Sequence, residues 1–294
     1  MIWLIISILT NTLLLLILKG FEKYGVNTLH GIVVNYCVAA TTGLIVAGIP
    51  DYDTLITGAG DYLWIPLSLG FLFISIFFTL AKTAQVAGIS VATVANKMSV
   101  VIPVVAAVVL YSESLSLLKI VGIAAALVAV WMTSKKSDGS EFNPKTLLWP
   151  IVIFIGSGII DAMVNHLQRG VSDKSLIPFL LSLAFMSALT IGIITISYRV
   201  ITLKEYVSGR SILGGIILGI PNYFSIYAVT KALNSEITIG KDVLESSALY
   251  PINNMGIVIA SAIGALIVFR EKLSVMNWIG ILVSVVAIAL IAFA

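Results

Sequence analysis

Residues 88–111 read GISVATVANKMSVVIPVVAAVVLY, an apolar run with one lysine, Lys97, near its middle. The run is long enough to cross a membrane as a single helix, since a bilayer core requires about 20 residues. An ammonium group at bilayer depth costs at least about 2.5 kcal/mol, so it is kept only where it faces protein or water. We therefore expect Lys97 to mark a buried polar site inside a bundle of membrane helices.

The whole chain is as apolar as this segment. Of its 294 residues, 59% are hydrophobic and 11% are charged, and the mean hydropathy is +1.09. Soluble domains carry roughly 25% charged residues, so the composition excludes a soluble domain. The single cysteine excludes a disulfide within the chain. A net charge of +3 is too small to indicate a nucleic-acid partner.

Apolar runs between polar segments predict ten membrane-spanning helices. Strands are a poor alternative, because these runs are about twice as long as a membrane strand. The predicted helices lie at 2–19, 28–48, 63–86, 88–111, 115–132, 147–168, 175–198, 212–234, 243–269 and 274–293. The first of these has no basic segment before it and no cleavage site after it, which predicts a retained helix rather than a signal peptide.

The two sets of five predicted helices resemble each other. A shift of 158 residues places YSESLSLLKIVGI (111–123) on FREKLSVMNWIGI (269–281). The identical pairs are Glu113 and Glu271, Leu115 and Leu273, Ser116 and Ser274, Gly122 and Gly280, and Ile123 and Ile281. Five spans is an odd number, so the second set enters the membrane the other way up. An inverted repeat of this kind places a substrate site near the membrane midplane, at the junction of the halves.

The expected fold is therefore an all-α integral membrane protein of ten transmembrane helices, arranged as a five-plus-five inverted repeat around a central cavity. The first repeat covers residues 1–134 and the second covers 147–294. The polar segment 135–146 is the linker between them.

With these features the chain resembles the ten-helix members of the drug/metabolite transporter superfamily, particularly the EamA-like carriers. The resemblance rests on the ends of the fourth and ninth predicted helices. Each has an aromatic residue, a glutamate and a leucine-serine pair before the next helix, as in Glu113-Ser114-Leu115-Ser116 and Glu271-Lys272-Leu273-Ser274. Length and span count match over essentially the whole chain. The resemblance implies alternating access to a cavity walled by the third, fourth, eighth and ninth helices.

Two predicted helices carry the most informative polar residues. Lys97, Asn96 and Thr93 share one face of the fourth helix. They form a donor cluster suited to a carboxylate, phosphate or carbonyl oxygen. Asp161, with Asn165 one turn later, lies about midway along the sixth helix and is the candidate partner of Lys97. Asp161 is expected to act in coupling or gating, and a purely structural ion pair with Lys97 is the alternative.

The eighth and ninth helices supply further candidates for substrate binding. Pro251 removes a backbone donor and is expected to kink or unwind the ninth helix. The polar residues near it and in the eighth helix are Ser247, Tyr250, Asn253, Asn254 and Asn222. The alternative is that these side chains only join neighbouring helices.

Lys82 and Lys231 occupy equivalent places in the two halves under a shift of 149 residues. They are candidates for the two mouths of one pathway, and for each alone an anchor at the headgroups is the alternative. His30 is interpreted as a packing residue, and no metal site is expected. No catalytic residue and no cofactor are expected either, because two histidines and one cysteine are a poor basis for a membrane enzyme.

The predicted function is secondary transport, with export favoured, of a small polar or amphipathic metabolite such as an amino acid or related zwitterion. The expected partners are this small molecule and the lipid bilayer, with protons as a candidate coupling ion and a homodimer left open. Under the 158 shift Lys97 falls on Met255, so a second intramembrane cation is missing. A flippase for a lipid-linked intermediate and a phosphate or sugar-phosphate antiporter remain alternatives.

Charges in the loops predict the orientation in a cell (inner) membrane. Ten basic residues lie on one side, namely Lys19, Lys23, Lys135, Lys136, Lys145, Arg199, Lys204, Arg210, Arg270 and Lys272. The other side has four, namely Lys119, Arg169, Lys174 and Lys241. The positive-inside rule then places both termini outside. The family resemblance implies the opposite, with termini inside.

Overall fold

The computed structural model describes residues 2–111, 116–134, 144–233, 237–239, 242–244 and 246–292; within these ranges the side chains of 111, 144–146, 230, 233, 237–239, 242–244 and 246–250 are not described. The helices are α1 (Ile2–Lys23), α2 (Thr28–Ala47), α3 (Tyr52–Ala59), α4 (Trp64–Val86), α5 (Ile89–Met98), α6 (Val101–Tyr111), α7 (Leu117–Thr133), α8 (Pro144–Gly170), α9 (Ile177–Leu203), α10 (Gly209–Leu233), α11 (Ser246–Phe269) and α12 (Val275–Ala292). Two short 3-10 helices cover Gly60–Tyr62 and Lys174–Leu176.

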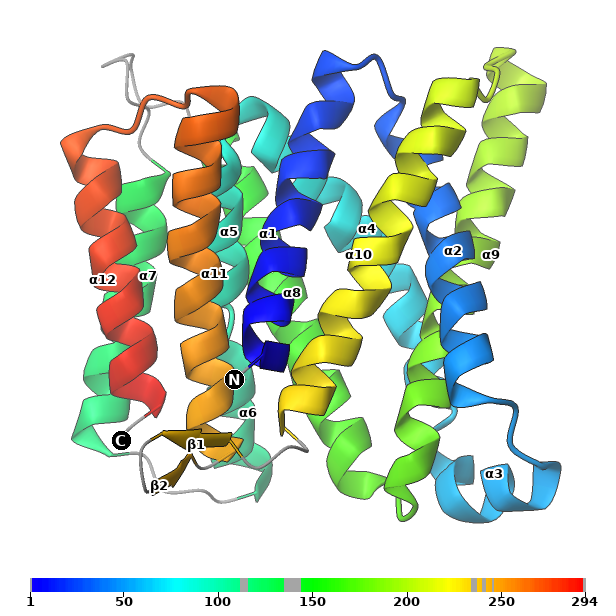
Figure 1. Cartoon of the computed structure of the whole chain (residues 1–294), viewed down its shortest axis with the longest axis horizontal. Coiled ribbons are helices and arrows are strands. Elements are labelled where there is room, and N and C mark those ends of the chain that lie inside the picture. Colours follow the sequence, from blue (N-terminus) through cyan, green and yellow to red (C-terminus); the bar gives the residue numbers. More distant parts are fainter. Residues whose placement is uncertain are drawn as a thin grey trace.

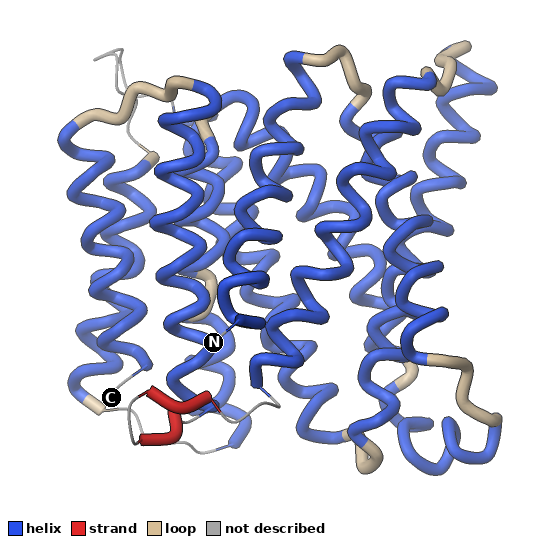
Figure 2. Tube along the Cα trace, viewed as in Figure 1, coloured by secondary structure: helices blue, strands red, loops and turns tan. Residues whose placement is uncertain are grey.

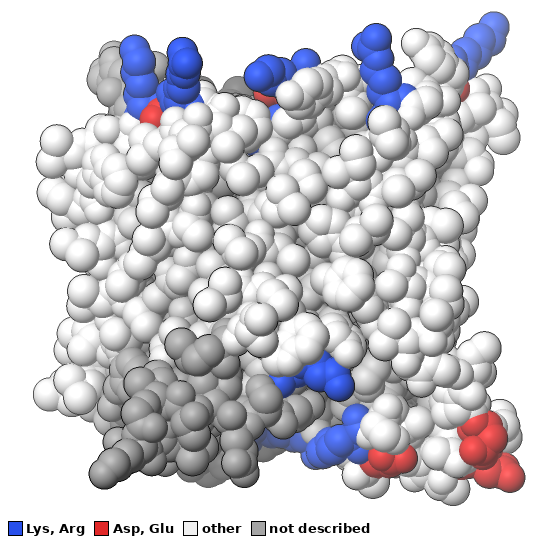
Figure 3. Space-filling model, viewed as in Figure 1, with Lys and Arg blue, Asp and Glu red and all other residues white. Residues whose placement is uncertain are grey.

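The long helices run side by side as one bundle, seen as a cartoon in Figure 1 and as a tube in Figure 2. Within the described ranges, nine helical spans are long and apolar enough to cross a membrane, counting α5 and α6 together, and α7 is a shorter apolar helix. In the view of Figure 3, charged side chains gather towards the two ends of the bundle, and the wide band between them is uncharged. Large hydrophobic side chains are exposed along this band, as at Ile45, Val109 and Leu282. The chain is thus an integral membrane protein, because lipid rather than water suits such a surface.

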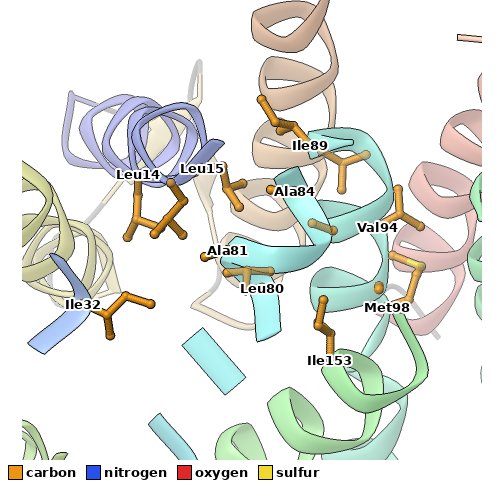
Figure 4. Close-up of a cluster of buried hydrophobic side chains, with 14 of the residues drawn as sticks. Leu14, Leu15, Ile32, Leu80, Ala81, Ala84, Ile89, Val94, Met98 and Ile153 are labelled. Carbon is orange, nitrogen blue, oxygen red and sulfur yellow. The ribbon is translucent and has the colours of Figure 1, made fainter. Parts of the chain in front are cut away.

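The core lies where α1, α2, α4, α5 and α8 meet. Figure 4 shows Leu14 and Leu15 of α1 near Leu80 and Ala81 of α4, with Met98 of α5 near Ile153 of α8. Ile89, Val94, Met98 and Ile153 are fully buried. One face of α5 is therefore held by packing, which leaves its other face for the site described below.

Polar residues and glycines begin and end the helices as their chemistry predicts. The side chain of Asn27 accepts hydrogen bonds from the backbone N–H groups of Leu29 and His30 at the start of α2, and the side chain of Ser116 accepts one from Lys119 N–H at the start of α7. Gly88, with φ of +107°, separates α4 from α5. Only glycine adopts this backbone conformation without strain.

The structure differs from the sequence prediction in three places. The predicted helix 88–111 is two helices, because residues 99 and 100 are not helical. The predicted loop 51–62 contains α3, which begins with Asp51 accepting from Thr54 N–H. A hairpin of β1 (Ile237–Ile239) and β2 (Asp242–Leu244) precedes α11, paired antiparallel with Ile237 opposite Leu244. The tracts 112–115 and 135–143, which include Glu113 and most of the expected linker, lie outside the described residues.

Candidate functional site

A cavity of about 580 Å³ lies inside the bundle. Its lining combines an apolar wall with a polar wall. The apolar wall includes Val100, Val104, Val108, Val229 and Ile288, and the polar wall includes Lys97, Asp161, Asn165, Asn253 and Asn254. The cavity extends to Lys119, Arg169 and Ala292, at the start of α7 and the ends of α8 and α12. These helix ends lie on the side of the molecule where the C-terminus lies in Figure 1. The cavity therefore reaches from the middle of the bundle to that side.

Lys97 is placed by the break between α5 and α6. Pro103 lacks a backbone N–H and its ring crowds the carbonyl four residues earlier, that of Ser99, so the helix stops at this point. The Ser99 hydroxyl donates to the Asn96 carbonyl at 2.5 Å, and Ile102 N–H donates to the Ser99 carbonyl at 2.9 Å. Asn96 and Lys97 thus occupy the last turn of α5, half-buried against the cavity.

Asp161 of α8 lines the same cavity and is exposed to it. Its closest hydrogen-bond donor is the Ser99 hydroxyl, at 3.5 Å, while Asn96 donates to the Ser157 hydroxyl at 3.2 Å. Among the ion pairs of the described side chains, none joins Lys97 to Asp161 directly. Lys97 and Asp161 therefore line the same cavity without forming a direct ion pair.

Helix α11 contributes Asn253 and Asn254 to the cavity. Asn253 is buried, and its side-chain oxygen accepts no hydrogen bond from any described group. The helix is continuous from Ser246 to Phe269, so the break expected at Pro251 is absent and lies instead at residues 99 and 100 of the other half. The side chains of Ser247 and Tyr250 lie outside the described residues.

Four other predicted residues lie elsewhere. Asn222 of α10 lines a smaller adjoining cavity and donates to the side-chain oxygen of Asn35 at 3.1 Å. Thr93 is buried, and its hydroxyl donates to the Ile89 carbonyl at 2.8 Å. Lys82 and Lys231 line neither cavity, and each ammonium lies over the ring four residues earlier, Phe78 at 5.9 Å and Tyr227 at 5.5 Å.

The cavity also contains polar residues that sequence reasoning did not select. They are Asn11, Lys119, Gln168 and Arg169. Asn11 is a lone amide in the apolar run of α1, which is a signal that could have been used. In the sequence analysis Lys119 and Arg169 were used only as loop charges that predict the orientation. The packing of α7 and α8 shows that they also line the cavity.

On the opposite side of the bundle, Glu271 joins the two halves of the chain. Its carboxylate accepts a hydrogen bond from Ile89 N–H, the first residue of α5, at 3.0 Å, and forms an ion pair with Lys19 of α1. A side-chain carbon at Gly88 would lie 3.1 Å from this carboxylate. We call Lys19, Gly88, Ile89 and Glu271 the closed-end cluster, because negative charge at the N-terminus of α5 and an ion pair together join α1, α5 and the segment after α11 at this end.

His30 faces Glu205 rather than a metal site. The His30 Nε2 atom lies 3.7 Å from the Glu205 carboxylate, which also accepts two hydrogen bonds from Arg199 Nε at 3.1 Å. The hydrogen bonds from Arg199 hold the pKa of Glu205 below its usual value. No group of His, Cys, Asp and Glu side chains able to hold a metal ion occurs within the described parts of the chain.

The chain was compared with known protein families, known sequences and solved structures. No model of a known protein family matches it. An "uncharacterized protein" of Haemophilus influenzae is 30% identical over 293 residues, which cover 97% of this chain and 95% of the relative. The chain belongs to the same family as this relative.

A solved crystal structure of another protein matches the bundle with a TM-score of 0.53 over 98% of each chain. Its sequence is 15% identical to this chain, so the match shows a shared fold alone. The Haemophilus influenzae relative and this structure both match along nearly the whole chain, from α1 to α12.

The polar wall on α11 allows a test of the site. Replacing Asn254 by leucine should weaken substrate binding about tenfold while thermal stability is unchanged, because an amide that lines the cavity is lost and no charge is introduced. Binding and melting temperature should be measured on the same purified preparation. Unchanged affinity would remove Asn254 from the binding wall.

Proposed function

We propose that this protein is a secondary transporter of a small polar or amphipathic metabolite. The observation that carries the proposal is the cavity that Lys97 and Asp161 both line inside an apolar bundle. Ionisable groups within membrane helices are expensive and mark substrate or ion pathways. Both groups line the cavity and do not form a direct ion pair with each other. They are therefore available to a ligand. The chemistry suits a zwitterion, and export is the favoured direction.

The proposal includes a ten-span inverted repeat and membership of the EamA-like group of the drug/metabolite transporter superfamily. Helix contacts support the repeat. A side-chain carbon at Gly122 of α7 would meet Ile291 N of α12 at 3.1 Å, and one at Gly280 of α12 would meet Thr133 N of α7 at 3.0 Å. A shift of 158 carries Gly122 to Gly280 and Thr133 to Ile291. The packing of α2 on α10 likewise corresponds to that of α9 on α4.

The difference between the two ends supports alternating access. The cavity reaches the side where α7 begins, and the closed-end cluster seals the other side. Transport then requires two linked changes. The residues of the closed-end cluster separate, and the cavity closes at the side of the bundle where Lys119 and Arg169 lie. In secondary transporters this exchange is largely a rocking of one repeat against the other around a fixed site.

A phosphate or sugar-phosphate antiporter is the second candidate. It is favoured by the lining itself, because Lys119 and Arg169 line the same cavity as Lys97. Cations are the usual ligands of phosphate oxygens. An exchange assay separates the two candidates, since an antiporter of this kind trades labelled for unlabelled phosphate and a zwitterion carrier does not.

The function is tested by a ligand screen followed by transport. Thermal shift of the purified protein should find a zwitterionic metabolite that raises its melting temperature, since a ligand bound only by the folded state stabilises it. Counterflow of that compound into proteoliposomes should then be saturable. A compound that stabilises the protein without being transported would indicate a binding protein or a flippase instead.

We further propose that the side bearing Lys19, Arg210 and Arg270 is cytoplasmic, which places both termini outside. Figure 3 supports this, because in that view more Lys and Arg side chains lie at this end of the bundle, whereas at the other end fewer of them lie beside acidic side chains. A cysteine introduced at Asp51 should react with a membrane-impermeant reagent in intact cells. Labelling only after permeabilisation would reverse the orientation.

A further inference from the structure

The main cavity adjoins a second, smaller cavity of about 140 Å³. Asn96, Asp161 and Ile226 line both. Beyond Asp161 the wall of the smaller cavity becomes aromatic, with Tyr36 of α2, Phe73 and Phe77 of α4, and Phe185 of α9. Aromatic side chains from three helices of the bundle thus line the same small cavity as one carboxylate.

The four aromatic rings support one another. The ring centre of Tyr36 lies 6.0 Å from that of Phe77 and 6.1 Å from that of Phe185, and Phe73 lies 5.5 Å from Phe185. Tyr36 and Phe185 are almost completely buried within the protein core. Rings packed at these distances are held in place, so together they form a fixed aromatic wall on this side of the cavity.

The two cavities differ in electrostatic character. Asp161 is the only charged side chain among the residues described around the smaller cavity, whose polar neighbours are Tyr36, Asn96, Ser157 and Asn222. The faces of aromatic rings carry partial negative charge, so rings and carboxylate act in the same sense. The larger cavity has Lys97, Lys119 and Arg169 as well as Asp161. A dipolar ligand is therefore oriented with its cation in the smaller cavity and its anion in the larger.

We propose that the smaller cavity binds the ammonium group of the substrate, and that N-methylated ammonium groups are accepted there. Asp161 supplies the opposite charge, and Tyr36, Phe73, Phe77 and Phe185 supply cation–π contact. Methyl groups on nitrogen cost little in such a site, because ring faces require no N–H donor. The anionic end of the substrate lies towards Lys97. This assignment rests on the proposed transport function and names the class of compound transported.

The test compares choline with 3,3-dimethylbutan-1-ol, which has nearly the same size and shape but no charge. Titration calorimetry on the purified protein should show choline binding at least about tenfold more tightly than the neutral alcohol. Phe185→Leu, which removes a ring but keeps an apolar side chain, should weaken choline binding about three- to tenfold. Asp161→Asn should weaken it about tenfold or more. Neither change should affect the alcohol to that degree.

Phe154→Leu is the matched control, because Phe154 lies in α8 and packs on the core away from both cavities. This variant should bind choline as the unaltered protein does. Equal binding of choline and the alcohol would show a merely apolar pocket and overturn the ammonium site. If choline does not bind to protein that still transports a zwitterion saturably, the ammonium site is wrong and the transport function stands. Because the comparison of the two probes needs no variant, poor folding of Phe185→Leu does not prevent the decision.

Discussion

Replacing Lys97 by methionine should abolish saturable transport while leaving the protein folded. Methionine keeps the length of the side chain and removes the ammonium that lines the cavity. A hydrogen bond to a charged group is worth about 1.5 to 3 kcal/mol, so the apparent affinity should fall about ten- to a hundredfold. The measurement is counterflow into proteoliposomes, with the melting temperature recorded for the same preparation. Lys23→Met, an exposed lysine at the end of α1, is the control and should transport normally.

A double variant separates substrate binding from a structural ion pair. If Lys97 and Asp161 only neutralise each other, either single change strands a charge and lowers stability, and Lys97→Met with Asp161→Asn restores it. The absence of direct contact between the two side chains leads us to expect stable single variants instead. Asp161→Asn should then alter the pH dependence of transport if the carboxylate takes part in coupling. Recovery of both stability and transport in the double variant would reduce Lys97 to a structural group.

The second large effect is expected at the closed-end cluster. Glu271→Ala should lower the free energy of unfolding by about 1.5 to 3 kcal/mol, because the Ile89 N–H and the Lys19 ammonium both lose their acceptor. Gly88→Ala should have a similar effect, since a side-chain carbon at φ of +107° is strained and approaches the same carboxylate. Thermal unfolding in detergent measures both variants.

Glu22→Ala is the control for this experiment, because it removes an exposed carboxylate from the same end of α1. It should leave stability unchanged. If Glu271→Ala is as stable as the unaltered protein, the carboxylate does not hold the helices together. If both Glu271→Ala and Gly88→Ala are destabilised and also transport more slowly, the cluster both stabilises the bundle and shapes the exchange between its two ends.

The helical architecture was accessible from the sequence because the bilayer leaves little choice. An apolar run of about 20 residues must satisfy its backbone internally, so hydropathy alone predicted helices within a few residues of α1, α2 and α4. The loop segment that became α3 is too short and too polar to carry this signal. The hairpin β1–β2 depends on pairing between segments, which hydropathy does not report.

The site was predictable residue by residue but not as a surface. Lys97 and Asp161 were selected because a charge inside an apolar helix is conspicuous, and they line one cavity. Thr93 was predicted to share the face of Lys97, yet its hydroxyl donates a hydrogen bond to the Ile89 carbonyl within α5. The helix break was expected at Pro251, but little more than one turn precedes that proline in α11. Pro103 lies well inside the apolar run 88–111, where the loss of a backbone hydrogen bond does interrupt the helix, and it falls in the first turn of α6.

The close approach of α7 and α12 through Gly122 and Gly280 has a mechanical consequence. A side-chain carbon at Gly122 or Gly280 would lie only 3.1 or 3.0 Å from a backbone nitrogen of the facing helix, so the two helix backbones approach closely and have little room to slide. We therefore expect α7 and α12 to move together. Displacements of the rest of the bundle should then be taken up in segments outside this pair, namely residues 99 and 100 between α5 and α6 and residues 270–274 between α11 and α12. The first of these segments begins two residues after Lys97, so a motion there would change the position of the charge that faces the cavity.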